Sequence, residues 1–339
     1  MAESLATKYR PKEFNEIVGQ RSVVKILEAQ ITTKKYSNAY LFAGASGSGK
    51  TTTARIFARK INNGPGGIIE LDAASNNGVD NIRQITQEAR ERSLDSEYKI
   101  FILDECQMLT NAAWSSLLKT LEEPNKYTIF IFCTTDPQKI PATILNRVQR
   151  FNFTRLTREE IEQRLKDVCI AEGFQNYLDT VKYISSTCNG GMRDALTALE
   201  KCSFLGNDLN LETAIESLGG YAYKDFFEIL NAIIDDAEDV LTLKLHNYYY
   251  AGNDMSIFIE QFLDFVFDVS KYCLFQNMSL LKIPASMEND LKYVSGFEGS
   301  LKYYAFIVDK MLGIKFAIKN DVNVFNTINI MFLQMARGK

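Results

Sequence analysis

A short stretch near the start of the chain, residues 44–51, has residue types and a spacing that could bind phosphate. It reads Gly-Ala-Ser-Gly-Ser-Gly-Lys-Thr and matches the pattern Gly-x-x-x-x-Gly-Lys-[Ser/Thr] in full. Glycines let the backbone wrap phosphates with its N–H groups pointing inward, and the start of a helix adds a partial positive charge. We expect Lys50 to reach the β- and γ-phosphates of a nucleotide and the Thr51 hydroxyl to ligate Mg²⁺. The other positions expected to contact the nucleotide here are Gly44, Ser46, Gly47, Ser48, Gly49 and Thr52.

Two carboxylates, Asp104 and Glu105, follow the apolar run Ile-Phe-Ile-Leu at residues 100–103. In a protein with a phosphate-binding loop, the first carboxylate after such a strand holds Mg²⁺, directly or through water. The second carboxylate can polarise the attacking water. The alternative is an acidic pair on the surface after a strand, and the complete loop upstream favours the catalytic interpretation.

The next apolar run ends in polar residues, which read Phe-Cys-Thr-Thr-Asp at residues 132–136. A hydroxyl there could sense the γ-phosphate or orient the attacking water. Because polar residues are common at strand ends, this run by itself supports a functional and a structural interpretation equally.

These side chains need a scaffold that brings several strand ends and the start of one helix together. Over about the first 150 residues, short apolar runs alternate with helical patterns, which is typical of a parallel α/β sheet. The runs expected to form its five strands are residues 39–42, 68–71, 99–103, 128–133 and 149–153. The expected helices between them are residues 50–62, 79–92 and 111–122. Thr110 is expected to cap the last of these helices and Pro124 to end it.

After residue 153 the strand pattern stops and helical patterns take over. A first group of helices is expected at residues 158–172, 177–187, 192–205 and 211–218. Gly219-Gly220 suits a domain boundary, because paired glycines interrupt a helix. Beyond it, helices are expected at residues 223–235, 239–250, 255–275 and 301–319. We therefore expect an α/β domain followed by two all-helical parts.

Composition limits the kinds of function that the chain can have. Its net charge of −4 and isoelectric point of about 5.4 argue against attraction of the whole chain to DNA, so DNA contact needs a local patch or a ring of subunits. No apolar run approaches the roughly 18 residues that span a bilayer, and the N-terminus lacks a signal peptide's apolar core, so we expect a cytoplasmic protein with no membrane partner. The six cysteines form no Cys-x-x-Cys pair and there is one histidine, so we expect reduced thiols and no zinc.

An ordered set of further motifs runs from residue 8 to residue 195. They are Lys-Tyr-Arg-Pro at 8–11, Phe-Asn-Glu-Ile-Val-Gly-Gln at 14–20, Glu-Leu-Asp-Ala-Ala-Ser at 70–75, Leu-Leu-Lys-Thr-Leu-Glu-Glu-Pro at 117–124, Thr-Thr-Asp-Pro-Gln-Lys-Ile-Pro at 134–141 and Gly-Gly-Met-Arg-Asp-Ala at 190–195. In this set the chain resembles the gamma/tau subunits of the bacterial DNA polymerase III clamp loader and, less closely, the small subunits of replication factor C. These are AAA+ ATPases, and a generic AAA+ protein would share only the loop and the two carboxylates.

The resemblance implies a fold, a function and partners. The implied domains are an α/β P-loop AAA+ domain with a five-stranded parallel sheet at residues 1–154, a small helical lid at 155–219 and an all-α collar for oligomerisation at 220–339. The implied function is an ATPase of a DNA polymerase holoenzyme that uses ATP and Mg²⁺ to open a sliding clamp and load it on primer-template DNA. The implied partners are the clamp, other loader subunits in a pentamer-like ring, and primer-template DNA.

The resemblance also assigns roles to single residues. Thr135 falls at the sensor 1 position, and Arg193 falls at sensor 2, where it would contact the γ-phosphate from the lid. Arg147 falls at the arginine finger, which reaches the ATP of a neighbouring subunit. Arginine suits that role because it is always charged and binds phosphate through two donors. The residues that would line the adenine pocket are Tyr9, Arg10, Pro11 and Val18.

Three features depart from the family's pattern. The family's finger motif reads Ser-Arg-Cys, whereas this chain has Asn-Arg-Val at residues 146–148, which keeps the arginine in another frame. The bacterial subunits carry a cysteine zinc module after the loop helix, but here residues 62–67 lead directly into the next strand, so no zinc is expected. Gln107 stands where the family often has histidine, a change that should not remove Mg²⁺ binding. A module-poor subunit of this kind would suit a phage or mobile-element replication system.

DNA contact is expected at two helix starts. In the family, DNA phosphates are contacted near the starts of the helices that follow the Asp-Ala-Ala-Ser segment and the Asp-Glu strand. In this chain those places hold Arg83 and Asn111, which are therefore the expected DNA-binding residues. The alternative for each of them is a solvated helix end.

Two other functions stay open on the sequence alone. A related AAA+ protein that remodels DNA, in branch migration or recombination, would share the loop but would carry a winged-helix domain in place of a helical collar. A largely structural loader subunit is expected to have lost the loop or the two carboxylates, and both are intact here.

Overall fold

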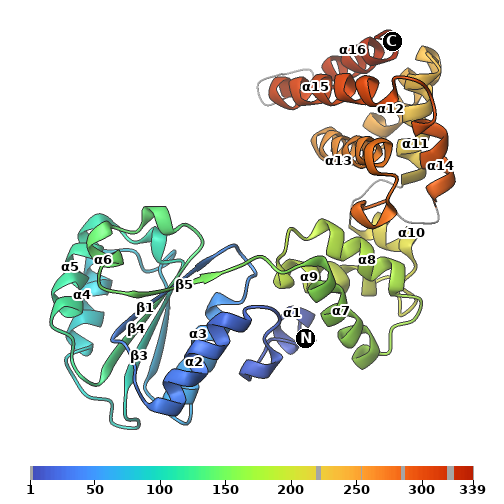
Figure 1. Cartoon of the computed structure of the whole chain (residues 1–339). Helices are drawn as coiled ribbons and strands as arrows, with labels where there is room; N and C mark the ends of the chain where they lie inside the picture. The colour runs from blue at the N-terminus through green and yellow to red at the C-terminus, as the bar shows by residue number, and fades with distance from the viewer. Residues whose placement is uncertain (1–2, 219–222, 253, 284–286, 319–323, 339) are drawn as a thin grey trace. The chain divides into compact units, whose positions relative to one another are not determined.

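A parallel sheet of five strands forms the first part of the chain, in the order β2-β3-β4-β1-β5 (Figure 1). The computed structural model describes residues 3–218, 223–252, 254–283, 287–318 and 324–338. The strands are β1 (Ala39–Gly44), β2 (Ile68–Asp72), β3 (Lys99–Asp104), β4 (Thr128–Thr134) and β5 (Gln149–Phe153). The predicted five-stranded parallel sheet is confirmed, and each strand contains every residue expected for it.

The inner strands are buried on both faces, which explains why their sequences are continuously apolar rather than alternating. All 7 residues of β4 are buried. In β1, Tyr40 and Phe42 belong to the core on one face of the sheet, while Ala39 and Leu41 belong to the core on the other. This is the two-residue period of a strand, with both sides covered.

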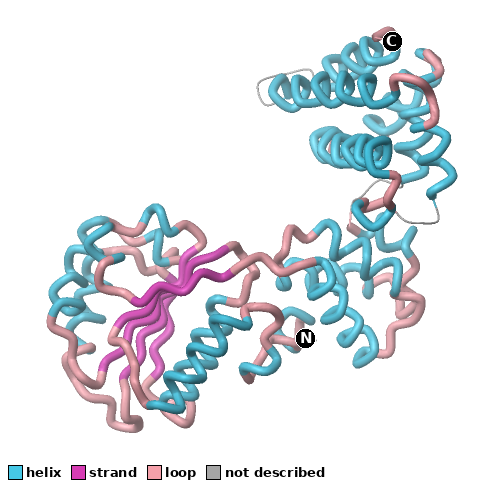
Figure 2. Tube along the Cα trace, in the orientation of Figure 1, coloured by secondary structure: helices cyan, strands magenta, loops and turns pink. Residues whose placement is uncertain are grey.

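Helices cover the two faces of the sheet, as Figure 2 shows in cyan beside the magenta strands. α2 (Arg21–Thr33) and α3 (Lys50–Ile61) bury Leu27 and Phe57 on one face. α4 (Val79–Glu88), α5 (Asn111–Glu122) and α6 (Ala142–Leu145) cover the other face, where Trp114 packs on Phe132. α2 and α6 were not predicted from the sequence.

The strand register aligns the ends of β1, β3 and β4 at one edge of the sheet. Ala43 pairs with Thr134, and Leu103 pairs with Phe132. The connection after β1 runs to β2 at one side of the sheet, whereas the connection after β4 leads to β5 at the opposite side. The direction of winding therefore reverses between β1 and β4, which is where open α/β sheets bind their ligands.

The helix expected at residues 79–92 is shorter than predicted and ends at Glu88. Arg90 N–H bonds to the Gln87 carbonyl at 3.1 Å, a tighter turn than the helix itself and a common way for helices to end. The Glu88 carbonyl accepts a hydrogen bond from Lys99 Nζ at 2.9 Å. At α5 the predicted cap is present, because Thr110 Oγ1 accepts from the Ala113 N–H at 3.2 Å.

Helices follow β5 throughout the described part of the chain (Figure 1). They are α7 (Arg158–Glu172), α8 (Leu178–Thr187), α9 (Met192–Ser203), α10 (Leu211–Ser217), α11 (Tyr223–Ile234), α12 (Glu238–Tyr250), α13 (Met255–Phe275), α14 (Glu288–Ser295), α15 (Ser300–Ile318) and α16 (Val324–Ala336). The eight helices predicted here are present, with ends shifted by two residues or fewer. The expected end of the last one, Lys319, lies outside the described residues. α14 and α16 were not predicted.

The contacts divide the chain into two compact units. The first unit contains Met1–Phe174 and Ile184–Glu200, and the second contains Gln175–Tyr183 and Lys201–Lys339. The division into three domains at residues 154 and 219 stays a prediction. Gly219-Gly220, where the second boundary was expected, lies outside the described residues.

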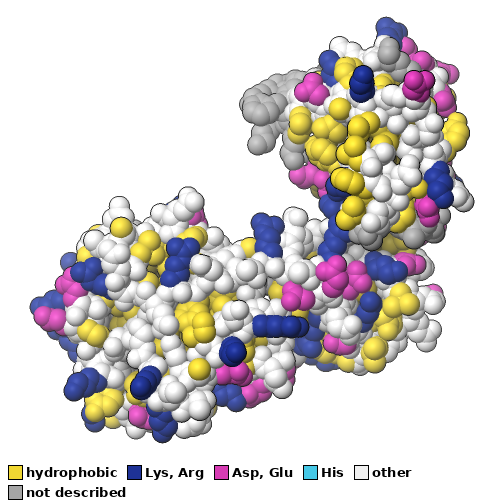
Figure 3. Space-filling model, in the orientation of Figure 1, with side chains coloured by type: hydrophobic (Ala, Val, Ile, Leu, Met, Phe, Trp, Pro, Cys, Tyr) yellow, Lys and Arg dark blue, Asp and Glu magenta, His cyan; other side chains and the backbone are white. Residues whose placement is uncertain are grey.

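The second unit packs around α13, whose buried aromatic side chains form the centre of its core. Phe258, Phe262 and Phe265 are buried there with Phe226 and Phe332. Large hydrophobic side chains also reach its surface, and Figure 3 shows hydrophobic atoms gathered on the viewed face of this unit. Among the helices that the structure describes, none is long and apolar enough to cross a bilayer.

Candidate functional site

The phosphate-binding loop joins a buried strand to the start of a helix, since β1 ends at Gly44 and α3 begins at Lys50. Two of its glycines have φ angles that other residues rarely adopt, 69° at Gly47 and 97° at Gly49. A Cβ on Gly47 would also lie only 3.0 Å from the Cα of Gly191. Position 47 therefore requires glycine both for its turn and for the close approach of another backbone.

Lys50 is buried within this loop, with 6% of its surface exposed. Its Nζ donates to the carbonyl oxygens of Gly44 and Ala45, each at 2.9 Å. Burial lowers the pKa of Lys50. No described acidic residue forms an ion pair with Lys50, so the ammonium meets only neutral acceptors. The charges of Glu105 and Asp104 oppose this lowering but form no ion pair with Lys50. A buried ammonium without an ion-pair partner fits an anionic ligand such as a nucleotide phosphate.

Thr51 and Asp104 form a hydrogen-bonded pair of oxygen-bearing side chains beside the loop. Thr51 Oγ1 donates to Asp104 Oδ2 at 2.7 Å, which joins the first turn of α3 to the end of β3. Mg²⁺ is usually bound by one or two such protein oxygens together with water and substrate phosphates. The described residues contain no cluster of three or more His, Cys, Asp and Glu that could hold a metal ion without such help. The pair therefore fits Mg²⁺ shared with a phosphate.

Glu105 follows in a backbone conformation that is uncommon for a residue with a side chain, with φ at 48°. Its Oε2 accepts a hydrogen bond from Thr135 Oγ1 at 3.1 Å and another from Gln107 Nε2 at 2.5 Å. Its N–H donates to Asp104 Oδ1 at 3.0 Å. The carboxylate is thus held by residues from the ends of both β3 and β4, as the strand register predicts.

A cavity of about 370 Å³ lies at this edge of the sheet, inside the first unit. This volume is in the range of small-molecule sites. Its lining includes these residues named in the sequence analysis: Tyr9, Arg10, Pro11, Val18, Ser46, Gly47, Ser48, Gly49, Lys50, Thr51, Thr52, Asp104, Glu105 and Arg193. Gly44 and Thr135 stand one contact away, through Lys50 and Glu105 respectively.

Basic side chains share this cavity. Arg10, Arg55 and Arg193 all line it. The N–H of Met192 donates to the Gly47 carbonyl at 3.2 Å, which brings the start of α9 to the loop. Burial lowers the pKa of Arg10, and the positive charges of Arg55 and Arg193 lower it further. Like charges that crowd one cavity favour an anion between them.

Two lining arginines were missed by the sequence analysis. Arg55 forms two hydrogen bonds with the Glu70 carboxylate, one of them from Nε at 2.6 Å. It lies four residues after Thr51 on α3 and so shares its helix face, which is a signal that could have found it. Arg164 on α7 donates to the Tyr9 carbonyl at 3.2 Å. No local pattern links these two distant positions.

Besides Gly44 and Thr135, three predicted residues lie outside the cavity lining. Arg147 donates from Nη2 to Glu122 Oε1 and from Nη1 to the Thr143 carbonyl, both at 2.6 Å. Arg83 is exposed and pairs with Asp80 on its own helix at 3.2 Å. Asn111 is the exposed first residue of α5. The structure does not bring these three side chains to the other predicted site residues.

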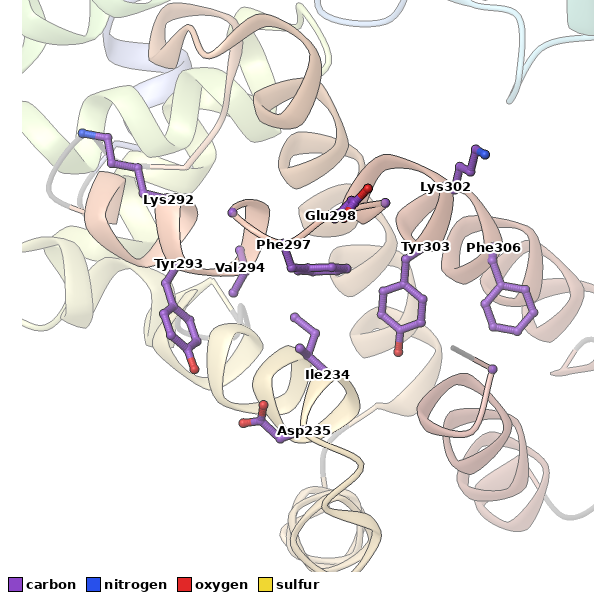
Figure 4. A pocket seen from close by; sticks show the side chains of 13 residues that line it. Ile234, Asp235, Lys292, Tyr293, Val294, Phe297, Glu298, Lys302, Tyr303 and Phe306 are labelled. Atoms are coloured by element: carbon purple, nitrogen blue, oxygen red, sulfur yellow. The ribbon is translucent and has the colours of Figure 1, made fainter.

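A larger cavity of about 1000 Å³ lies in the second unit. Figure 4 shows Ile234, Phe297 and Tyr303 pointing toward one another there, with Lys292 and Lys302 at the sides. Its lining is mainly apolar and aromatic and does not include the phosphate-binding loop, so it does not resemble a nucleotide phosphate site. The smaller cavity of the first unit is therefore the candidate functional site.

Known proteins resemble this chain in sequence. The family described as DNA polymerase III, delta subunit, matches residues 67–157. The DNA polymerase III subunit tau of Bacillus subtilis is 36% identical over 314 residues, which is 86% of this chain and 54% of that protein. The gamma/tau subunit of Mycoplasma genitalium is 32% identical over 325 residues, 89% of this chain and 53% of that protein. The chain therefore spans about half the length of these two relatives.

A third relative matches along nearly its whole length, and solved structures match in fold. The DNA polymerase III subunit gamma of Buchnera aphidicola is 33% identical over 334 residues, 91% of this chain and 90% of that protein. The RuvB Holliday junction branch migration motor of Thermotoga maritima has a TM-score of 0.52 at 20% identity, over 70% of this chain and 85% of that one. This second likeness shows the P-loop AAA+ fold alone. The extent of the first shows that this chain belongs to the DNA polymerase III gamma/tau family.

Proposed function

We propose that this chain is an ATPase subunit of a DNA polymerase sliding-clamp loader that works in the cytoplasm. The observation that carries the proposal is one cavity in which a buried lysine, a threonine–aspartate pair and a tethered glutamate surround a phosphate-binding loop. Membership of the gamma/tau family supports the same function. The likeness to RuvB concerns the fold and does not favour a branch-migration activity for this chain.

Nucleotide binding would rest on residues of the first unit. Lys50 would turn from the two carbonyls that it contacts to the β- and γ-phosphates of ATP. Thr51 and Asp104 would hold Mg²⁺, which neutralises phosphate charge when it is bound. Arg193 would contact the γ-phosphate from the start of α9. The residues proposed for the adenine pocket are Tyr9, Arg10, Pro11 and Val18.

Hydrolysis would need a water aligned with the γ-phosphate and a base for its proton. Glu105 is the proposed base, because it lines the cavity and carries a carboxylate whose position is fixed from two strand ends. Thr135 would keep that carboxylate in place and sense the γ-phosphate. Positioning and charge neutralisation account for most of the catalysis of phosphoryl transfer, so these contacts matter more than any covalent step.

Arg147 would act on the ATP of a neighbouring subunit. Its guanidinium lies away from its own cavity and is held by Glu122, in an ion pair whose two side chains are 33% and 48% exposed. An exposed ion pair of this kind contributes little stability, so exchanging a carboxylate for a phosphate costs little. The charge that would complete each site thus belongs to the next subunit.

The remaining parts of the proposal concern assembly. We propose an AAA+ domain at residues 1–154, a lid at 155–219 and a collar at 220–339 through which subunits form a ring. The ring would bind a sliding clamp and primer-template DNA, with Arg83 and Asn111 near the DNA phosphates. The basis for these assignments is family membership together with the exposed position of both side chains.

A clamp-loading assay tests this function. The full chain, its companion subunits and the cognate clamp are incubated with primed circular DNA, and labelled clamp retained on the circle is counted after gel filtration. The proposal expects retention with ATP, which is lost without ATP or when Mg²⁺ is removed by EDTA. Retention that does not depend on nucleotide would contradict it.

A further inference from the structure

Gln107 lies at the centre of a small hydrogen-bonded group behind the candidate site. It belongs to the short helical turn η2 (Cys106–Met108), directly after the two carboxylates. Its Nε2 donates to Glu105 Oε2 at 2.5 Å and to Thr135 Oγ1 at 3.0 Å. Its Oε1 accepts from Thr134 Oγ1 at 2.7 Å. One amide therefore contacts three polar side chains from the ends of β3 and β4.

The neighbours determine which way this amide points. A carboxylate accepts hydrogen bonds and cannot donate them, so the Gln107 atom facing Glu105 must be the nitrogen. The buried Thr134 hydroxyl already accepts from the N–H of Asp136 at 3.0 Å, which leaves its proton for the Gln107 oxygen. Each donor of this group therefore faces an acceptor. Position 107 needs a side chain that donates toward Glu105 and accepts from Thr134, which an amide or a similar group can do.

The consequence for Glu105 is that its two oxygens have different surroundings. Oε2 is anchored by Gln107 and by Thr135 Oγ1. Among the described residues, none forms a hydrogen bond with Oε1. Because Glu105 also lines the cavity, Oε1 is the oxygen left to act on water. The two groups that hold Oε2 also bond to each other, since Gln107 Nε2 donates to Thr135 Oγ1.

We propose that Gln107 is a positioning residue that ties the Glu105 carboxylate and the Thr135 hydroxyl into one unit. Gln107 does not line the cavity and acts on the reaction through Glu105. This inference rests on the proposed ATPase function, in which Glu105 takes the proton of the attacking water. Removing the amide frees the carboxylate to rotate away, and a misplaced base lowers the rate of the chemical step more than it lowers ATP binding.

Gln107→Met tests the proposal, because methionine keeps the length and approximate volume of the side chain but has no amide. In the full chain, assembled with clamp and primed DNA, we expect kcat to fall about tenfold to a hundredfold. KM and the Kd for ATP should stay within about twofold, because the loop and Lys50 are untouched. The matched control is Gln138→Met, at an exposed glutamine outside the cavity lining, which should match the wild type.

A second variant asks whether hydrogen bonding is what matters. Gln107→His offers one donor and one acceptor when its imidazole is neutral, as it is near pH 8 with an ordinary pKa of about 6.5. We expect it to recover part of the kcat that Gln107→Met loses. Unchanged kcat in Gln107→Met would overturn the proposal. An equal loss of kcat and ATP affinity in that variant would also overturn it, because that pattern indicates damage to the loop or the fold.

A stability measurement separates this inference from the proposed ATPase function. Urea unfolding midpoints are compared for Gln107→Met, Thr135→Val and the double variant of the nucleotide-free chain. Since both single changes damage the same group, we expect the loss in the double variant to be smaller than the sum of the single losses. Additive losses would overturn the network. A wild-type complex that does not hydrolyse ATP would instead overturn the proposed function while the urea result still reports on Gln107.

Discussion

At the scale of single residues, Lys50 is a buried positive charge that a bound anion would neutralise. Its ammonium is buried and meets two carbonyl oxygens but no described acidic partner. Burial lowers the pKa of Lys50, so the folded chain carries the charged form at a cost at neutral pH. A lysine whose pKa is lower in the folded state binds its proton less tightly there than in the unfolded chain. It therefore destabilises the fold as the pH falls below its unfolded-state pKa, and the full loss is reached below the folded-state pKa. A bound phosphate would offset this cost.

Replacing Lys50 should therefore separate stability from binding. In Lys50→Met we expect the melting temperature of the nucleotide-free chain to be unchanged or higher, because an unpaired buried charge is removed. The Kd for ATP should rise about tenfold to a hundredfold, as loss of a charge-assisted contact to phosphate predicts. Calorimetric melting and equilibrium nucleotide binding measure the two effects.

Lys60→Met is the matched control, because Lys60 lies on the same helix but is half-exposed and pairs with Glu13 at 2.5 Å. It should leave the Kd for ATP unchanged. If Lys50→Met lowers the melting temperature and keeps the wild-type Kd, the ammonium is a structural group and the phosphate role is wrong.

At the scale of elements, the site is formed where several strands end, and the sequences of these strands follow patterns that predict them. The five strands could be predicted because continuous apolar runs are typical of a parallel sheet that is covered on both faces. The phosphate-binding loop could be predicted because its glycines and lysine fall at fixed positions. α2 was missed although the sequence carries a signal for it, because Val23 and Leu27 are apolar, lie four residues apart on one helix face and are both buried. Arg164 could not be predicted, because its contact with Tyr9 depends on tertiary packing.

Gly47 allows a test of whether the conformation of the phosphate-binding loop requires glycine. Gly47→Ala places a side chain at a φ of 69° and 3.0 Å from the Cα of Gly191. We expect a loss of about 1–2 kcal/mol in the free energy of unfolding and weaker ATP binding. Urea unfolding and nucleotide titration measure both quantities.

Gly78→Ala provides the comparison, because Gly78 has a φ of −75° and open space where a Cβ would stand. Its free energy of unfolding should stay within about 0.5 kcal/mol of the wild type, as for most surface substitutions. Equal effects of the two substitutions would mean that the loop conformation does not depend on glycine at position 47.

At the scale of the whole molecule, the first unit contains both the candidate site and Arg147, the predicted finger residue, but Arg147 does not line the cavity of that site. Arg147 is held by Glu122 and by the Thr143 carbonyl. Its finger role was predicted from the family's motif, because no contact within one chain indicates it. Nothing local in a sequence reports a contact between subunits. We therefore expect one chain to bind ATP and expect efficient hydrolysis only in an assembly.

Arg147→Ala tests this separation. We expect hydrolysis by the assembled complex to fall about a thousandfold, in line with other arginine fingers. ATP binding by the isolated chain should keep a Kd within about twofold of the wild type. Arg150→Ala is the control and should change neither quantity, because the exposed Arg150 side chain bonds only to Asn152 among the described residues. Equal loss of binding and hydrolysis in Arg147→Ala would place the residue in its own site or in folding.

The proposed clamp-loader ATPase function is best tested by the steady-state rate of ATP hydrolysis, measured with and without the cognate clamp and primed DNA. We predict slow hydrolysis by the isolated chain and at least about a tenfold rise when companion subunits, clamp and primed DNA are all present, which corresponds to a barrier about 1.4 kcal/mol lower. A rate that neither clamp nor primed DNA changes would show that this chain is not a clamp-loader ATPase.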